Sequence, residues 1–447
     1  MNTGQREGKC WLIGRNCVAL CLMLRGCGFF PVAGCVLFPV MTTSTFPEEL
    51  SIAARSKSPE SLAVDESFWA RVAGEYDCDP SFIQLNYGFY HPAARTVVEA
   101  EVAALRAINR RGSHFKWRDA EALFETARRE LAQLAGVDPA EIVITRNASE
   151  ALNIVIQGLA LGAGDEVVCT NQEYTATDQA WDQRARQDGI RVRRVAVPLD
   201  PASDEEIIRL FEAEITDRTR VIEVPHLVHF TGQVLPVEKL GELARRRGLP
   251  ILVDAAHSFA QLDFSIRELN CDYLAASLHK WLGAPLGTGL LYVRADRIAG
   301  VRPFFGDTHF AEENIRKLER FGNRPDSAFA GIRTAIQWHH AIGGTAVKQA
   351  RLAELQRSWT EPLRRHPRYR LLTPGAAGRH GAIGTFTLEG VPPEDVFNYL
   401  REQFGIFTVV QKSASYSGVR VTPGLPTSRE HIVRLVEALT EAAAHFA

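Results

Sequence analysis

Short apolar runs alternate with helix-like or turn-like segments along the chain from about residue 81 onward. Each run has the length of a β-strand, and the segments between the runs carry amphipathic spacing or turn residues. This alternation is typical of a mostly parallel sheet that is covered by helices. We expect seven strands in this part of the chain: Glu141–Thr145, Glu166–Cys169, Val192–Val197, Arg220–Val224, Pro250–Asp254, Tyr273–Ala276 and Gly289–Val293.

Helices precede these strands and dominate the C-terminal part. Pro92–Arg110 and Trp117–Ala135 are predicted to be helical, and Gly136 ends the second helix. Beyond the seventh strand the pattern changes to a long helical stretch, Ser327–Arg364. The elements expected after it are the strands Ile383–Leu388, Ile406–Val410 and Val419–Val421 and the helices Pro393–Phe404 and Arg429–Phe446, the last one begun by a capping box of Thr427 and Glu430.

The pattern predicts an α/β protein with two domains. A chain of 447 residues, 46% hydrophobic and 23% charged, is long and apolar enough to bury a large core. We predict a large domain over residues 86–325, built on the mostly parallel seven-stranded sheet, and a smaller α+β domain over residues 326–447. Residues 41–85 are expected to pack with the small domain, and residues 1–40 to form an extension outside both domains.

The charge of the chain excludes one class of partner. The formal net charge is -2, so the chain lacks the basic excess that a nucleic-acid surface needs. We therefore expect no nucleic-acid partner.

The cysteines indicate a reduced, cytoplasmic protein whose first forty residues are unusual. Five of the eight cysteines lie within the first 35 residues. Apolar stretches there are interrupted by Arg15 and Arg25, so none reaches the roughly 18 to 20 apolar residues of a membrane helix, and we expect no membrane partner. We interpret residues 1–40 as an upstream extension of the reading frame with Met41 as the start; a targeting segment is the alternative.

One lysine and one aspartate carry the main chemical hypothesis. Lys280 follows the apolar run Tyr273–Ala276, and Asp254 closes an apolar run 26 positions earlier. Ligands of such sheets bind beyond the carboxyl ends of the strands. Pyridoxal phosphate needs this pair, because a lysine amine forms an imine with its aldehyde and a carboxylate keeps its pyridine nitrogen protonated. A solvated surface lysine in a structural turn is the alternative interpretation.

A phosphate site is predicted where the first of the seven strands leads into a helix. Asn147 can cap that helix while Glu150 reaches back, which leaves the amides of Ala148 and Ser149 free to face an anion at the positive helix end. An ordinary capped helix is the alternative. Neither a dinucleotide-binding glycine motif nor a P-loop motif is present in the sequence.

Several motifs in this order resemble the class V aminotransferase family of fold-type I pyridoxal phosphate enzymes, and most of all its isopenicillin N epimerase-like branch. The similarity covers the chain from about residue 80 to 447. The most specific segment is His279-Lys280-Trp-Leu-Gly-Ala-Pro-Leu-Gly. The other motifs are Asn147-Ala-Ser-Glu-Ala, Glu173-Tyr174, Thr231-Gly232 before Pro236, and Val253-Asp254-Ala-Ala-His257-Ser.

The resemblance implies roles for residues that match the family motifs. Lys280 would be the Schiff-base lysine and would carry the proton at the α-carbon. Asp254 would bind the pyridinium nitrogen, and His257 would contact the phenolic oxygen of the ring. Ser277 and His279 would join Ala148 and Ser149 at the phosphate.

Four further positions match the family less closely or on a single residue. Tyr174 lies where many relatives stack a histidine on the ring; a phenol can stack but does not shuttle protons near neutral pH as imidazole does. Arg420 matches the arginine that binds the substrate carboxylate, a role suited to a planar, two-pronged donor. Asn323 replaces the threonine with which relatives reach the phosphate in the neighbouring subunit of a homodimer. His229 replaces an asparagine near the cofactor and is given no role.

The reaction stays open at this level. A cysteine desulfurase of this fold needs a nucleophilic cysteine shortly before the Arg420 segment, and residues 401–426 contain none. Transamination, epimerisation or elimination at an amino acid or small peptide remains, and a non-catalytic protein that kept the fold is the alternative. Epimerisation also needs an acid on the second face of the substrate, for which Tyr174, Tyr87, Tyr90 and Tyr416 qualify by residue type alone. No metal is expected, because His226 and His229 without a third ligand make a poor site.

Overall fold

A computed structural model of the chain describes residues 47–306, 309–413 and 416–447. These residues belong to one compact unit, Ser44–Ala447. The predicted extension over residues 1–40 and the predicted start at Met41 lie outside the described residues.

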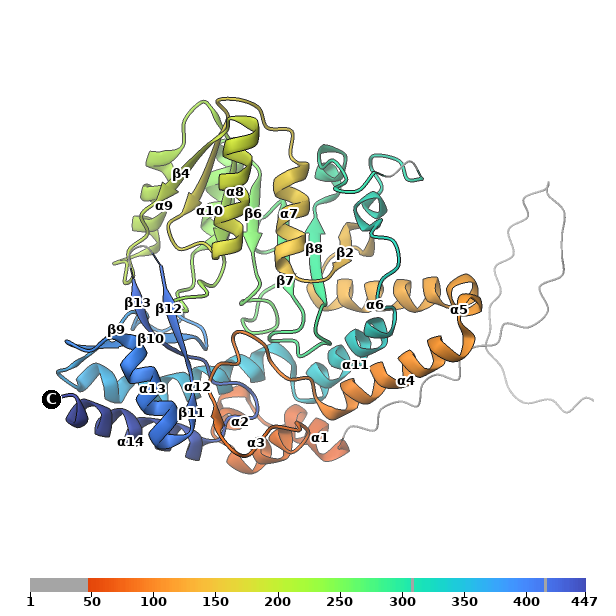
Figure 1. Cartoon of the computed structure of the whole chain (residues 1–447). Coiled ribbons are helices and arrows are strands. Elements are labelled where there is room, and N and C mark those ends of the chain that lie inside the picture. The colour runs from red at the N-terminus through yellow and green to blue at the C-terminus, as the bar shows by residue number, and fades with distance from the viewer. Residues whose placement is uncertain (1–46, 307–308, 414–415) are drawn as a thin grey trace, which may run out of the picture. The chain divides into compact units, whose positions relative to one another are not determined.

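A seven-stranded sheet forms the centre of the fold, with the order β2-β8-β7-β6-β5-β3-β4 (Figure 1). Strand β8 runs antiparallel to both of its neighbours, and the other neighbouring pairs are parallel. Each predicted run lies on one of these strands, so the mostly parallel α/β sheet is confirmed. The strands are β2 (Ile142–Thr145), β3 (Glu166–Thr170), β4 (Arg191–Val195), β5 (Thr219–Pro225), β6 (Ile251–Asp254), β7 (Tyr273–Ser277) and β8 (Gly289–Val293).

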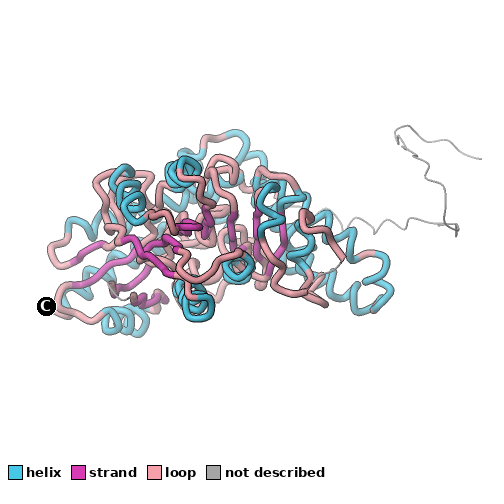
Figure 2. Tube along the Cα trace, turned by 90° about the horizontal axis from the view of Figure 1, so that it is seen from above, coloured by secondary structure: helices cyan, strands magenta, loops and turns pink. Residues whose placement is uncertain are grey.

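Helices cover both faces of this sheet, as the view from above shows (Figure 2). Tyr273 and Ala275 on β7 belong to the apolar cluster that includes α7, whereas Leu274 and Ala276 belong to a second cluster on the other face. Burial on both faces explains why the central strands are continuous apolar runs rather than alternating ones. The covering helices are α6 (Ala120–Ala135), α7 (Ala148–Gly158), α8 (Thr175–Asp188), α9 (Asp204–Glu214) and α10 (Val237–Arg246). Helices α4 (Arg95–Arg111) and α5 (Ser113–Arg118) lead into α6.

Two helix predictions need correction. The predicted helix from Trp117 to Ala135 is divided between α5 and α6, although Gly136 ends α6 in a left-handed conformation as expected. The predicted stretch Ser327–Arg364 is broken into α11 (Ser327–Ala341) and α12 (Gly344–Arg365). Gly343, the residue before α12, has a φ of 97°, and Gly344 at the first position of α12 has a φ of 72°; these left-handed conformations do not occur inside a continuous α-helix, so the chain turns there.

A four-stranded antiparallel sheet, drawn in blue in Figure 1, holds the C-terminal elements. Its order is β12-β13-β10-β9, and helices α13 (Pro393–Phe404) and α14 (Arg429–His445) accompany it. Helix α14 begins with a capping box of Ser428 and His431, so the predicted box of Thr427 and Glu430 is wrong by one residue. The strands are β9 (Tyr369–Leu371), β10 (Gly384–Leu388), β12 (Val409–Lys412) and β13 (Ser417–Val421).

The N-terminal segment reaches these C-terminal elements. The predicted strand Ile406–Val410 is two strands, because β11 (Ile406–Phe407) leaves the four-stranded sheet and pairs in parallel with β1 (Ile83–Gln84). Before β1 lie α1 (Glu48–Ser56), α2 (Pro59–Ala63) and α3 (Glu66–Ala73), and 3-10 turns occur at Pro139–Glu141, Ala295–Gly300 and Ile315–Glu319. The boundaries between domains stay a prediction. Within the described ranges, no helix is both long and apolar enough to cross a membrane.

Candidate active site

Lys280 lies in a tight turn at the carboxyl end of β7. The Gly283 amide donates to the Lys280 carbonyl at 3.0 Å, and Leu278 and Thr288 close the base of the turn with a backbone bond of 3.0 Å. Gly283 has a φ of 70°, a left-handed conformation that glycine adopts without steric cost. The Lys280 Nζ lies 3.1 Å from His257 Nε2, so the turn aims the amine at the residues that follow β6.

Asp254 and His257 come from that neighbouring strand end. Asp254 is 6% exposed, and its Oδ1 accepts a hydrogen bond of 2.8 Å from the Ala256 amide. Burial raises the pKa of Asp254, while the Ala256 bond and the charge of Lys280 oppose that rise. His257 is buried, and its Nδ1 has no hydrogen-bond partner among the described residues. A buried carboxylate and a buried imidazole nitrogen are thus both available to a ligand.

The electrostatics of the site favour a neutral lysine amine. Burial lowers the pKa of Lys280 to about 8; the charge of Asp254 raises it and that of Arg420 lowers it further. Burial also lowers the pKa of His257 well below its usual value, with the charges of Lys280 and Arg420 acting in the same direction. Lys280 is therefore partly deprotonated near neutral pH, as a nucleophilic amine must be.

Arg420 on β13 brings a buried positive charge to the same site. Its Nη1 donates to the His229 carbonyl at 2.8 Å and its Nη2 to Asn86 Oδ1 at 3.0 Å. It is 3% exposed, its Nε has no partner, and no carboxylate of the described chain pairs with it. Burial lowers its pKa to about 10. A buried guanidinium without a counter-ion is costly unless a ligand supplies the negative charge.

Tyr174 and His229 form an aromatic pair beside these charges. Tyr174 stands just before α8 with 42% of its surface exposed, and its ring meets the His229 ring edge-on at 5.3 Å and 84°. Burial, then the charges of Arg420 and Lys280, lower the pKa of His229 to about 3. The imidazole of His229 is thus neutral at any physiological pH.

The predicted phosphate site lies at the start of α7. The Ala148 amide donates to Ser277 Oγ at 3.0 Å, so it is not free as predicted, and the serine hydroxyl becomes the group that can face an anion. The Ser149 amide has no acceptor in the described part of the chain. His279 Nδ1 lies 3.0 Å from the Thr288 carbonyl, which leaves Nε2 available. The Ser149 amide, the Ser277 hydroxyl and the His279 imidazole therefore surround the positive end of the helix.

At this helix start, the predicted cap is confirmed and the contact of Glu150 differs from the prediction. Asn147 caps α7 by accepting from the Glu150 amide at 2.8 Å, as predicted. Glu150 reaches one residue further back than expected, to the Arg146 amide at 2.6 Å. A Cβ on Gly289 would lie 2.6 Å from the Asn147 backbone, so β8 approaches the helix start as closely as only glycine allows.

Asn323 is not brought to this site within the chain. It lies exposed in the loop between the last 3-10 turn and α11. No hydrogen bond in the described ranges joins it to the other predicted site residues. Its expected contact with a neighbouring subunit stays a prediction.

Sequence reasoning assigned no role to three polar residues near the site, although Glu173 is among the motif residues. Asn86, which holds Arg420, follows a two-residue strand that no periodicity could reveal. Glu173 and Glu223 are both buried, each feels the charge of Asp254, and Glu173 accepts from the Thr170 amide at 2.9 Å. Burial raises the pKa of Glu173 to about 8, and burial followed by the nearby Glu173 and Asp254 carboxyls raises the pKa of Glu223 well above its usual value. This carboxyl pair holds a proton at neutral pH.

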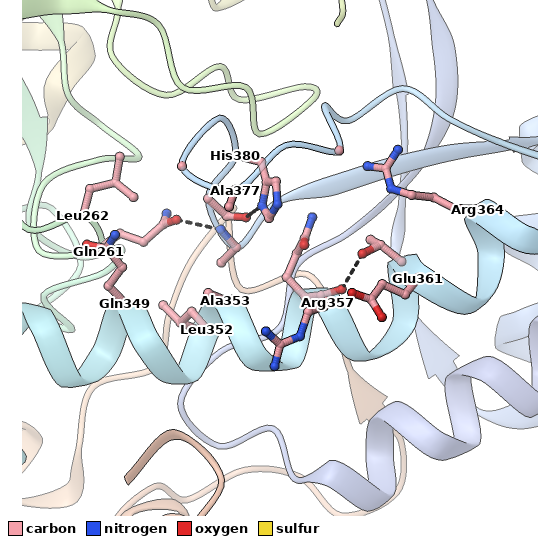
Figure 3. A pocket seen from close by; sticks show the side chains of 16 residues that line it. Gln261, Leu262, Gln349, Leu352, Ala353, Arg357, Glu361, Arg364, Ala377 and His380 are labelled. Carbon is pink, nitrogen blue, oxygen red and sulfur yellow. Dashed lines mark hydrogen bonds between the residues drawn. The ribbon is translucent and has the colours of Figure 1, made fainter. Parts of the chain in front are cut away.

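A separate cavity of about 370 Å³ lies beside α12 and under residues 375–382 (Figure 3). Its lining includes Arg357, Arg364, His380 and Gln261, and none of the predicted cofactor residues. Gln261 links the cavity to the site, because its Nε2 donates to the His257 carbonyl at 2.6 Å and its Oε1 accepts from the Ala382 amide at 2.7 Å.

The residues around Lys280 fit pyridoxal phosphate. The group offers an aldehyde, a ring nitrogen and a phosphate, and the site provides an amine of lowered pKa, a buried carboxylate without an ion-pair partner in the described chain, and a helix start with free donors. The unpaired Nδ1 of His257 gives the ring a further polar contact. Lys280 would bind the aldehyde, Asp254 the ring nitrogen, and Ser149, Ser277 and His279 the phosphate.

Comparison with known proteins agrees with this fit. The profile of the family "Aminotransferase class-V" matches residues 93–416. Isopenicillin N epimerase of Streptomyces clavuligerus is 30% identical over 392 residues, which cover 83% of this chain and 97% of that protein. A probable cysteine desulfurase of Vibrio cholerae is 28% identical, with coverage of 74% and 85%.

Solved structures share the fold. A cysteine desulfurase from Thermococcus onnurineus superposes with a TM-score of 0.75 at 23% identity and covers 84% of this chain and 98% of its own. The cystine C-S lyase C-DES superposes with a TM-score of 0.74 at 24% identity and covers 81% and 98%. The predicted fold type I is confirmed. The chain belongs to the class V aminotransferase family, as its motifs predict, and pyridoxal phosphate is its cofactor.

Proposed function

We propose that the chain moves a proton at the α-carbon of an amino acid or small peptide, and that its reaction is epimerisation. The observation that supports an amino acid or peptide substrate is Arg420. Its guanidinium is buried, has a fixed orientation, and has no carboxylate partner in the described chain. A substrate α-carboxylate would supply the missing charge with two-pronged geometry. Two isopenicillin N epimerases, each 30% identical over 83% of this chain, support the assignment of epimerisation.

Lys280 is proposed as the base on one face of the substrate. When bound, pyridoxal phosphate withdraws electrons from the bonds at the α-carbon. With a pKa of about 8, Lys280 has a neutral amine available to take the α-proton at Nζ. His257 Nε2, 3.1 Å away, accepts a hydrogen bond from Nζ and orients it. Asp254 would hold the proton on the pyridine nitrogen.

Tyr174 is proposed as the acid on the opposite face. Of the four tyrosines that qualify by residue type, Tyr174 is the one whose ring packs against the ring of His229. The His229 carbonyl in turn accepts a hydrogen bond from Arg420. Tyr87 is a poorer acid, because burial raises its pKa far above the usual value. If Tyr174 returns the proton, the configuration inverts; if Lys280 returns it, the configuration is retained.

Deuterium exchange tests the proposal. L-amino acids and small peptides are incubated in heavy water with the holoenzyme, followed by NMR of the α-position and chiral chromatography. We expect deuterium at the α-carbon together with the inverted isomer. Tyr174→Phe should lower inversion by about a hundredfold or more, the usual contribution of a general acid, and keep exchange with retention. Tyr399→Phe, which removes the hydroxyl of a tyrosine stacked on His445, is the matched control.

Other outcomes would select other reactions. Keto acid formation from the substrate would favour transamination and contradict the epimerase proposal. Release of sulfide from cysteine, or of cysteine persulfide from cystine as by the C-S lyase C-DES, would favour a β-lyase. A cysteine desulfurase reaction is the weaker alternative, because residues 401–426 lack a cysteine.

A non-catalytic role is tested by the lysine itself. If Lys280 binds the cofactor, borohydride should attach it covalently to the wild-type chain and not to Lys280→Ala. Cofactor that becomes covalently attached to Lys280→Ala would contradict the assignment of Lys280.

We also propose a homodimer formed through α4. Val98, Val102 and Leu105 repeat along one face of this helix with 47%, 37% and 49% of their surfaces exposed. The opposite face is buried through Val97 and Ala104. Leu286 is a further exposed apolar residue, 68% exposed, and its neighbour Pro285 lies near Gly331, as does Glu101 of α4. Contiguous exposed apolar residues of this kind mark an interaction surface.

A further inference from the structure

Lys348 is a second buried lysine, and it lies directly behind the turn that carries Lys280. It belongs to α12, is 2% exposed, and donates from Nζ to the carbonyl of Trp281, the residue after Lys280. Its Nζ also lies 3.3 Å from His339 Nδ1, and His339 Nε2 lies 3.1 Å from Thr345 Oγ1. Lysine is among the residues least often fully buried, so this placement needs a reason.

No negative charge compensates this lysine. Among the residues that the structure describes, no carboxylate forms an ion pair with Lys348. The titratable groups that face it are His339 on α11 and His91 before α4, and burial followed by the charge of Lys348 lowers the pKa of His339 well below its usual value. Burial lowers the pKa of Lys348 itself to about 7. Both imidazoles are therefore neutral while Lys348 titrates near neutral pH.

The Lys348 ammonium group contacts the active-site turn at the Trp281 carbonyl. The carbonyl belongs to the residue next to Lys280, so its direction and the direction of the Lys280 side chain are coupled through three backbone angles, ψ of Lys280 and φ and ψ of Trp281. Small errors in the position of a reacting group reduce its effectiveness strongly. A hydrogen bond from an ammonium group holds a carbonyl more firmly than one from a neutral donor.

We propose that Lys348 is a positioning residue for Lys280: its Nζ holds the Trp281 carbonyl, and this contact keeps the Lys280 amine aimed at His257 and the cofactor. The inference rests on the proposed role of Lys280. The ammonium form of Lys348 gives the firmer hold, so the contact is strongest below a pH of about 7 and weakens above it.

Two variants separate the contact from the charge. Lys348→Met removes the donor and the charge at similar length, whereas Lys348→Gln keeps an N–H donor without a titratable charge. Lys317→Met is the matched control, since Lys317 is also buried, at 5% exposure, but lies in a 3-10 turn away from the active-site turn. The measurement is the dissociation constant of pyridoxal phosphate, taken well below and well above a pH of about 7, with thermal unfolding of the apoprotein beside it.

The ratio of variant to wild-type dissociation constants is the decisive quantity, because the titration of Lys280 cancels in it. For Lys348→Met the ratio should be about 10 at low pH, because the variant loses one hydrogen bond from a charged group, and it should be smaller at high pH. For Lys348→Gln it should approach one at high pH. Lys317→Met should leave the ratio at one throughout.

Two results would overturn the proposal. A ratio for Lys348→Met that stays at one, or one that is equally large at every pH, would show that Lys348 only fills space. If Lys348→Met fails to fold, the same decision falls to Lys348→Gln, whose ratio must decline with rising pH. Failure of the proposed role of Lys280 is distinct, because borohydride would then attach pyridoxal phosphate to Lys280→Ala as well as to the wild-type chain.

Discussion

Arg420 Nη2 donates to Asn86 Oδ1 at 3.0 Å, a bond that joins residues 334 positions apart in the chain. A second bond, from Nη1 to the His229 carbonyl at 2.8 Å, completes the hold on the guanidinium plane. The orientation of Arg420 is thus set before any substrate arrives, by the segment after β1 and the loop after β5. Preorganisation of this kind improves binding because less ordering is needed in the complex.

Asn86→Ala should weaken the binding of a carboxylate substrate. Removing the Asn86 amide frees one edge of Arg420, and a hydrogen bond to a charged group is worth about 1.5–3 kcal/mol. We expect KM to rise about tenfold or more while kcat changes less, because the contact positions the binding group and not Lys280. Steady-state kinetics measure both. Asn109→Ala, which removes an exposed asparagine bonded to the Leu105 carbonyl, is the control; an unchanged KM for Asn86→Ala would refute the role.

The reaction of the apoprotein with pyridoxal phosphate should depend on pH through Lys280. Only the neutral amine attacks the aldehyde, and the pKa of Lys280 is about 8. The rate should therefore rise about tenfold per pH unit below that value and level off above it, followed as growth of the visible absorption band. An ordinary lysine would keep rising to near its usual pKa of about 10.4, and such a profile would contradict the lowered pKa.

Val102→Glu should convert the proposed homodimer into a monomer. A carboxylate in the middle of an apolar interface loses its hydration without a partner, which costs several kcal/mol. Light scattering after size-exclusion chromatography measures the mass. Val433→Glu, on the exposed face of α14 where Val433 is 51% exposed, is the matched control and should leave the mass unchanged. A wild-type chain that is monomeric at all concentrations would refute the interface.

Gly343→Ala should destabilise the break between α11 and α12. Gly343 has a φ of 97°, and a Cβ there would lie 2.5 Å from Val347 Cγ2. A left-handed conformation costs a non-glycine residue roughly 1–2 kcal/mol, and the contact adds to it. Denaturant unfolding measures the loss. Gly300→Ala, where nothing lies within 4 Å and φ is not positive, should change the free energy of unfolding little; equal effects at both positions would contradict the explanation.

Local pattern was sufficient for most of the fold. The seven strands of the central sheet were predicted because strands buried on both faces are continuous apolar runs, which is a local property. The break at Gly343 and Gly344 was missed because the flanking residues keep helical spacing on both sides, and only the left-handed φ angles separate α11 from α12. The segment Ile406–Val410 is predicted as one strand for a similar reason, whereas the structure divides it because β11 pairs with β1, more than 300 residues earlier in the chain.

By itself, the sequence determined the α/β class, the cofactor chemistry of Lys280 and Asp254, and the family, because strand periodicity and contiguous motifs are encoded by neighbouring residues. Only the tertiary structure decided that Asn86 holds Arg420, that Glu173 and Glu223 share a buried site, and that Lys348 supports the turn of Lys280. These contacts join residues far apart in the chain. Burial then shifts their pKa values, and burial is a property of the folded chain that no stretch of sequence carries alone.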